Sequence, residues 1–161
     1  MLDNPMTDNP VTDNPGLRDL ELLHRRLDDL RHLVGGLCDY LDRGRPSPDQ
    51  EKATHSAMKV AEETANTVDQ ELEDQIALVR QTDPTLLDQW VDVHQAILRE
   101  AAVECQASDT FDEGFIQTAL FVIKQETEQW EKVRTGGRYY VNGNRYFLRH
   151  ADRIARKNFG F

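Results

Sequence analysis

Three segments of this chain begin with a polar residue followed by proline, and each leads into apolar residues at helical spacing. The polar residues are Asn14, Ser47 and Asp83. Their side chains can accept a hydrogen bond from the first turn of a helix, and the following proline has the backbone angle of a helix start. Gln50 lies three residues after Ser47, as a capping box requires. These positions therefore predict three helix starts.

A fourth start is predicted at Thr110, because Glu113 follows it at the spacing of a second capping box. Gly44 and the pair Gly136 and Gly137 are typical of the residues at which helices end. The expected helices span residues 15–43, 48–82, 84–106 and 111–135.

The apolar residues within these segments recur every three or four positions, which places them on one face of each helix. The first segment carries Leu20, Leu23, Leu27, Leu30, Val34, Leu37 and Leu41. The second carries Ala57, Ala61, Ala65, Val68, Leu72, Ile76 and Val79. The third and fourth carry Leu87, Trp90, Ile97, Leu98 and Ala101, then Phe115, Ala119, Val122, Ile123, Trp130 and Val133. Short connections favour antiparallel neighbours, so we expect a mainly α fold, an up-down-up-down four-helix bundle over residues 15–135.

Two glycines and two cysteines on these helices lead to further expectations. Gly35 and Gly36 lie inside the first helix, where two glycines cost about 2 kcal/mol, so we expect a kink or break there. Cys38 and Cys105 fall on apolar faces at different heights, so we expect two buried, unreactive thiols rather than a disulfide.

The two ends of the chain differ from its centre. Residues 1–14 repeat the motif Asp-Asn-Pro, in which proline keeps the preceding residue out of a helix, so we expect an extended acidic leader. Residues 136–161 form a separate arm, in which Asn142 and Gly143 between two aromatic runs predict a β-hairpin. A short terminal helix is expected at 148–158.

Charge divides the chain at Val133. The part up to Val133 has a net charge of −16, whereas the part after it has a net charge of +6 and half of the aromatic residues. Arginine and tyrosine are favoured at interfaces, so we expect the arm to bind a partner. The candidate partner-binding residues are Arg138, Tyr139, Tyr140, Arg145, Tyr146, Arg149, Arg153, Arg156 and Lys157. The same cationic segment is also compatible with folding back onto the acidic helices of its own chain.

Composition excludes several classes of protein. Two cysteines in 161 residues are too few for a disulfide scaffold, and the acidic start is unlike a secretion signal. No apolar run is long enough to span a membrane. We therefore expect a cytoplasmic protein with no membrane contact. Phosphate-binding loops, the Gly-x-Ser-x-Gly motif and His-Glu-x-x-His are absent from the sequence, so the familiar enzyme classes have no support, although an enzyme of another kind stays open.

Two ionisable residues fall on apolar helix faces at the same expected height. His94 lies between Trp90 and Ile97, and Glu126 lies on the corresponding face of the fourth helix. The sequence predicts that they form a buried polar pair that fixes the register of the bundle.

A metal site is the competing interpretation of this layer. Glu21 and His24 form one Glu-x-x-His, a motif that di-iron bundles use twice, and Glu21 lies at the flank of the leucine stripe. Because the motif occurs once, the expectation from sequence is that there is no metal and no cofactor.

The function expected from sequence is that of a non-enzymatic adaptor or accessory subunit. It would dock on a protein partner with an acidic surface through the arm, in a homo-oligomer or a hetero-complex. One alternative is a nucleic-acid-associated protein whose arm contacts the phosphate backbone. Another is a metal-binding or enzymatic helical bundle centred on His94 and Glu126.

Overall fold

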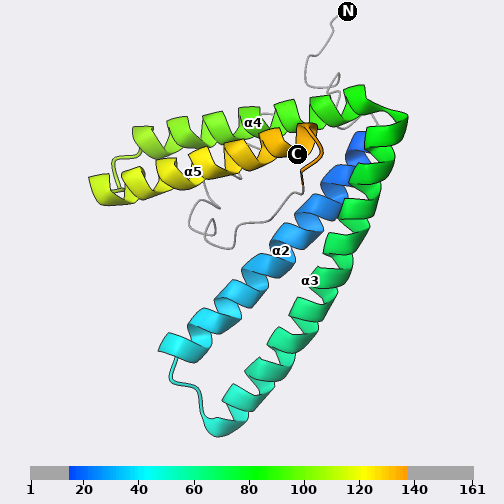
Figure 1. Cartoon of the computed structure of the whole chain (residues 1–161). Coiled ribbons are helices and arrows are strands. Elements are labelled where there is room, and N and C mark those ends of the chain that lie inside the picture. The colour runs from blue at the N-terminus through cyan, green and yellow to red at the C-terminus, as the bar shows by residue number, and fades with distance from the viewer. Residues whose placement is uncertain (1–14, 138–161) are drawn as a thin grey trace, which may run out of the picture.

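The computed structural model describes residues 15–137, and within this range the protein is mainly α, with four helices and no strands. The helices are α2 (Pro15–Arg43), α3 (Pro48–Thr82), α4 (Pro84–Ala107) and α5 (Glu113–Arg134) (Figure 1). The predicted leader, β-hairpin and terminal helix lie outside the described residues. None of the four helices is long and apolar enough to cross a membrane.

The predicted caps of α3 and α4 are confirmed. Ser47 and Gln50 form a reciprocal capping box, in which the Gln50 backbone N–H donates to Ser47 Oγ at 3.2 Å and the Ser47 N–H donates to Gln50 Oε1 at 2.9 Å. Asp83 ends α3 and also caps α4, where its carboxylate accepts a hydrogen bond from the Leu86 N–H. Both helices begin where the sequence predicts because these caps are local interactions.

The predicted cap of α5 is wrong. This helix begins at Glu113, and its N-cap is Asp112, whose carboxylate accepts a hydrogen bond of 2.7 Å from the Phe115 N–H. Thr110 lies before the helix, where its own N–H donates to Ser108 Oγ. The Asp112 carboxylate accepts a hydrogen bond from the first turn of α5 and interacts favourably with the positive end of the helix dipole. Asp112 therefore caps the helix in place of Thr110.

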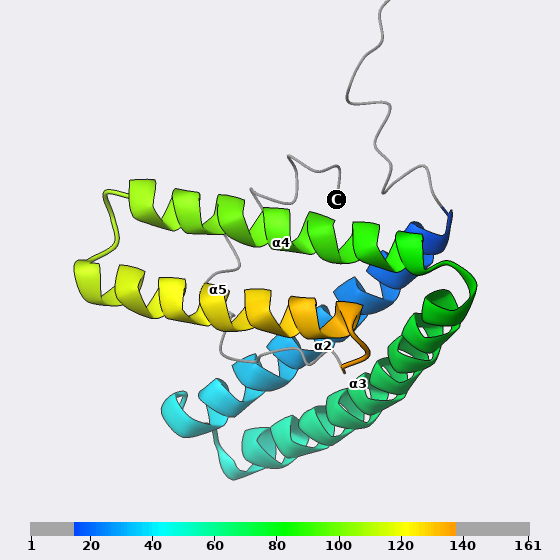
Figure 2. The same ribbon diagram turned by 45° about the horizontal axis from the view of Figure 1, so that its top comes forward.

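The four helices form two antiparallel hairpins. α2 packs along α3, and α4 packs along α5 (Figures 1 and 2). The hairpins meet at the end where α3 turns into α4, and from this shared end they diverge in a V. One polar contact across the shared end joins Arg80 of α3 to α5, because its guanidinium donates a 2.9 Å hydrogen bond to the Val133 carbonyl.

In the first hairpin, the apolar core lies near this shared end. All buried residues of α2 fall within 17–28, and all those of α3 fall within 61–79. Further along the first hairpin, Val34, Leu37 and Leu41 are only half-buried and Ala57 is exposed. The apolar stripes predicted along the full length of both helices are therefore covered by the second hairpin only over the half next to the shared end.

Two expectations about α2, a break at Gly35 and Gly36 and a buried Cys38, are wrong. The helix is continuous through Gly35 and Gly36, where no atom of a neighbouring element lies within 4 Å of the place that a β-carbon would occupy. Cys38 is exposed, whereas Cys105 is buried as predicted. The exposure of Cys38 follows from the divergence of the hairpins, because no residue of α2 beyond Asp28 is buried.

Candidate metal centre

Glu21 and His24 of α2 and His94 of α4 meet in the core at the shared end of the hairpins. Their exposed fractions are 4%, 0% and 3%. One carboxylate oxygen of Glu21 and one ring nitrogen of each histidine lie within 4.8 Å of one another. Among residues 15–137, this is the one group of three such side chains close enough to share an ion.

The helices determine how these three side chains meet. Glu21 and His24 are three residues apart, so they project from the same face of α2. His94 comes from α4, and its Nε2 lies 2.6 Å from Glu21 Oε1, a hydrogen bond between residues 73 positions apart. His24 Nδ1 lies 3.6 Å from the same oxygen. The Glu21 Oε1 atom thus lies close to one imidazole from each hairpin, His24 in the first and His94 in the second.

The electrostatics of the cluster favour an ionised Glu21. Burial raises the pKa of this carboxyl, but the charge of His94 and the hydrogen bonds from both histidines lower it more strongly. The pKa of Glu21 therefore lies well below its usual value. A carboxylate held in its charged form inside the core is a suitable ligand for a cation, because it does not have to lose a proton first.

Two tryptophans enclose the imidazoles. Trp130 of α5 stacks on His94, with ring centroids 4.1 Å apart and an angle of 5° between the planes. Trp90 of α4 packs edge-on to His94 at 5.4 Å and to His24 at 6.0 Å. The two indoles also contact each other at 4.8 Å. These rings exclude water from the cluster, and a low local dielectric strengthens every charge interaction inside it.

Glu126 lies on α5 at the level of His94. The contact of Trp90 with Trp130 and the hydrogen bond from Gln95 to the Thr127 carbonyl set the register of α4 against α5. Glu126 is 2% exposed, so the burial expected for both His94 and Glu126 is found. The direct contact between these two residues stays a prediction, and the observed hydrogen bond of His94 is with Glu21.

The burial of Glu21 is the feature of the site that the sequence pattern predicts least well. Its place at the flank of the leucine stripe suggests partial exposure, yet it is 4% exposed. The buried face of α2 near the shared end consists of Leu17, Leu20, Glu21, His24, Leu27 and Asp28, which is wider than the leucine stripe. The face is wide because α3 and α4 both contact this part of α2. The Glu-x-x-His motif is the signal that could have located the cluster.

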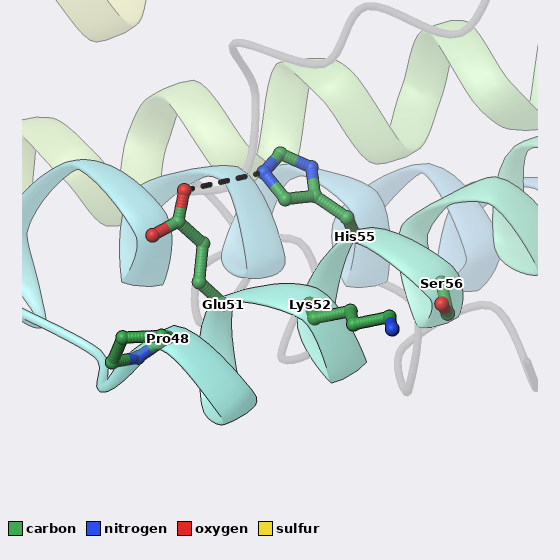
Figure 3. A pocket seen from close by; sticks show the side chains of 5 residues that line it. All are labelled: Pro48, Glu51, Lys52, His55 and Ser56. Atoms are coloured by element: carbon green, nitrogen blue, oxygen red, sulfur yellow. Dashed lines mark ion pairs between the residues drawn. The ribbon is translucent and has the colours of Figure 1, made fainter.

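The other predicted binding residues cannot be placed in the same way. Every member of the predicted partner-binding set, from Arg138 to Lys157, lies outside the described residues. An open surface pocket is found elsewhere, along the first turns of α3, and Figure 3 shows that its lining residues all come from this one helix. Its ion pair joins His55 to Glu51 at 3.9 Å with both side chains more than half exposed, so solvent screens it.

The donor set of Glu21, His24 and His94 determines which ions suit the cluster. Two imidazoles and one carboxylate suit zinc, iron and similar divalent transition metals, whereas calcium and magnesium prefer oxygen ligands alone. Ligand atoms around a tetrahedral zinc ion lie about 3.4 Å apart, since each is about 2.1 Å from the metal. Within the cluster, Glu21 Oε1 lies 2.6 Å from the nitrogen of His94 and 3.6 Å from that of His24, and the three ligand atoms lie within 4.8 Å of one another, so side-chain movements of about 1 Å would reach this spacing.

Comparison of the chain with protein-family models, with curated proteins and with solved structures finds no match in any of the three.

Proposed function

We propose that this protein binds one divalent transition-metal ion at Glu21, His24 and His94. The observation that supports the proposal is the meeting of these three buried side chains, with their ligand atoms within 4.8 Å of one another. The sequence gives two of the ligands as one Glu-x-x-His, and the fold adds an imidazole from a helix about 70 residues further along the chain.

The proposed ion would connect the two hairpins. Glu21 and His24 belong to the first hairpin and His94 belongs to the second. Metal binding that needs ligands from both hairpins stabilises the folded arrangement, because the unfolded chain does not hold these ligands together. A ligand present at 100 times its dissociation constant adds about 2.7 kcal/mol to the free energy of unfolding.

The test is metal analysis of full-length protein purified without chelators, followed by titration of the chelator-treated protein with Zn²⁺ or Co²⁺. We expect one equivalent of bound metal and a higher melting temperature on metal addition. His24→Gln and His94→Gln should each remove this response. His55→Gln is the matched control, because His55 is exposed on α3 and far along the first hairpin. Less than about a tenth of an equivalent, with no change in melting on adding zinc, cobalt, iron or manganese, contradicts the proposal.

A second candidate function is the adaptor role expected from sequence. The observation in its favour is that no residue of the first hairpin between positions 29 and 60 is buried, while Leu33 and Val60 are 51% and 63% exposed. Such a projecting hairpin is a suitable shape for an accessory subunit, with the basic arm as the proposed contact to an acidic protein surface.

The adaptor role is tested by capture of partners from the native cell extract. Wild-type protein is compared with a variant carrying Arg149→Glu, Arg153→Glu and Arg156→Glu. Loss of a specific partner in the variant, with unchanged melting, is the expected result. Titration with a DNA duplex at low salt separates the nucleic-acid alternative, because phosphate contacts give binding that weakens steeply with salt.

A further inference from the structure

We infer that the metal ion at this site keeps one coordination position for a small exogenous ligand, water or hydroxide, that accepts a hydrogen bond from the indole N–H of Trp90. This inference rests on the proposed metal binding and adds the chemistry of the site. It concerns a position that none of Glu21, His24 and His94 fills.

The number of protein ligands is the first observation. The cluster holds three candidate ligands, one carboxylate and two imidazoles. Zinc sites with a purely structural role are closed by four protein ligands, whereas sites with three protein ligands hold water or substrate at the fourth position. A centre of two histidines and one carboxylate is also the arrangement that leaves positions open on iron. The donor set therefore favours an open site.

Trp90 provides the second, independent observation. Its side chain is 0% exposed, and its Nε1 has no hydrogen-bond partner in the described part of the protein. A buried indole N–H without an acceptor is unfavourable, and tryptophans in cores normally have a partner for this group. The Trp90 ring lies nearly perpendicular to both imidazoles, at 84° to each, with ring centroids 5.4 Å from His94 and 6.0 Å from His24. An acceptor bound beside these rings would satisfy the donor.

Metal-bound water or hydroxide is an acceptor of this kind. A divalent cation lowers the pKa of its bound water, so that hydroxide forms near neutral pH on zinc. Hydroxide accepts a hydrogen bond from a neutral N–H strongly, because the acceptor is charged. A metal-bound hydroxide would thus supply the acceptor that the indole N–H of Trp90 lacks within residues 15–137.

The surroundings limit the ligand to a few atoms. The His94 ring is covered by Trp130 at 4.1 Å, His24 lies 4.7 Å from His94, and the two indoles contact at 4.8 Å. These spacings are those of packed rings, so we expect the site to take no ligand larger than water, hydroxide or a linear triatomic anion such as azide. A larger organic substrate would have to displace a tryptophan.

Glu126 is the competing occupant of the fourth position. It is a buried carboxylate on α5, and if it reached the ion it would add a second carboxylate ligand. Two carboxylates and two neutral imidazoles around a divalent ion would form a neutral, closed site. The experiment therefore has to distinguish an open site with an exogenous ligand from a site closed by Glu126.

The test is titration of the Co²⁺-loaded full-length protein with azide, followed by visible absorption. We expect the cobalt bands to change and to saturate with one azide per ion. Trp90→Phe keeps an aromatic ring but removes the donor, and should weaken azide binding by about tenfold or more. Phe121→Leu is the control, since Phe121 is 60% exposed on α5, and this variant should leave azide affinity close to that of the wild type.

A second readout uses the wild-type protein and so does not depend on a variant that folds. In ¹⁵N-labelled protein, the indole N–H resonance of Trp90, assigned with Trp130→Phe, should move downfield when Zn²⁺ is added and shift again with azide. The inference is overturned, while metal binding stands, if the cobalt bands do not change with azide or if the indole resonance of Trp90 shifts with neither Zn²⁺ nor azide. An azide response that appears only in Glu126→Gln identifies Glu126 as the fourth ligand and overturns the inference as well. Failure to bind one Co²⁺ ion contradicts the proposed function itself.

Discussion

The imidazole of His94 lies parallel to the indole of Trp130, with ring centroids 4.1 Å apart and planes within 5° of each other. This stack joins α4 to α5 beside the hydrogen bond from His94 to Glu21, which joins α4 to α2. His94 is therefore the residue through which both hairpins and three helices meet.

Trp130→Ala should destabilise the protein strongly. The side chain is 1% exposed, and its removal leaves a cavity against His94 and Trp90. Such truncations cost about 3–5 kcal/mol, which chemical denaturation of the two proteins would measure. Phe121→Ala on the same helix is the control, because Phe121 is 60% exposed and should change stability by no more than about 0.5 kcal/mol. A loss below about 1 kcal/mol for Trp130→Ala would be inconsistent with this packing.

Glu21→Gln should weaken the metal-free protein. The substitution removes the charge that His94 and His24 stabilise in the folded state, and breaking a buried ion pair costs about 3 kcal/mol or more. The measurement is the free energy of unfolding in the presence of a chelator. Glu62→Gln changes an exposed carboxylate of α3 and should have almost no effect. Equal stability of the two variants would mean that the Glu21 carboxylate is not held by the histidines.

Gly35→Ala and Gly36→Ala should each stabilise the protein by about 0.8–1 kcal/mol, because alanine has the higher helix propensity and both positions have space for a methyl group. Thermal melting would detect each change. Gly44→Ala should act in the opposite direction, since its β-carbon would lie 2.6 Å from the Tyr40 carbonyl oxygen. Destabilisation by Gly35→Ala or Gly36→Ala would indicate a contact that covers this part of α2.

The two cysteines should differ in reactivity. Cys38 is exposed, whereas Cys105 is 1% exposed and burial, with a smaller effect of Glu104, raises the pKa of its thiol. Because the thiolate is the reactive form, one thiol per chain should react rapidly with a disulfide reagent and the second only after unfolding. The reaction is followed by absorbance, and Cys38→Ala should remove the rapid phase. Two rapid phases in the wild type would contradict the burial of Cys105.

The helices and the antiparallel pairing of neighbours could be predicted closely from the sequence, but the divergence of the two hairpins could not. The ends of α3 follow from Ser47, Gln50 and Asp83, which act over three or four residues. The divergence of the hairpins depends on which apolar faces meet across the whole chain, so the half-buried state of Val34 and Leu37 has no local signal. The leucine pattern is the same along covered and uncovered halves of α2.

The candidate site, too, could be predicted from the sequence only in part. The positions of His94 and Glu126 on apolar faces predict their burial, because helical periodicity is local. The meeting of His94 with Glu21 depends on how α4 crosses α2, which the pattern of one helix does not contain. One Glu-x-x-His is therefore weak evidence in the sequence, and it becomes a candidate centre only when the fold adds the second imidazole.

The cluster lies near the vertex of the V, so a change in the angle between the hairpins there is magnified along the length of the first hairpin. From His24 to Arg43, α2 extends about 28 Å at 1.5 Å per residue. A change of about 10° in the angle at the vertex would displace the far tip of that hairpin by about 5 Å, close to the pitch of one helical turn.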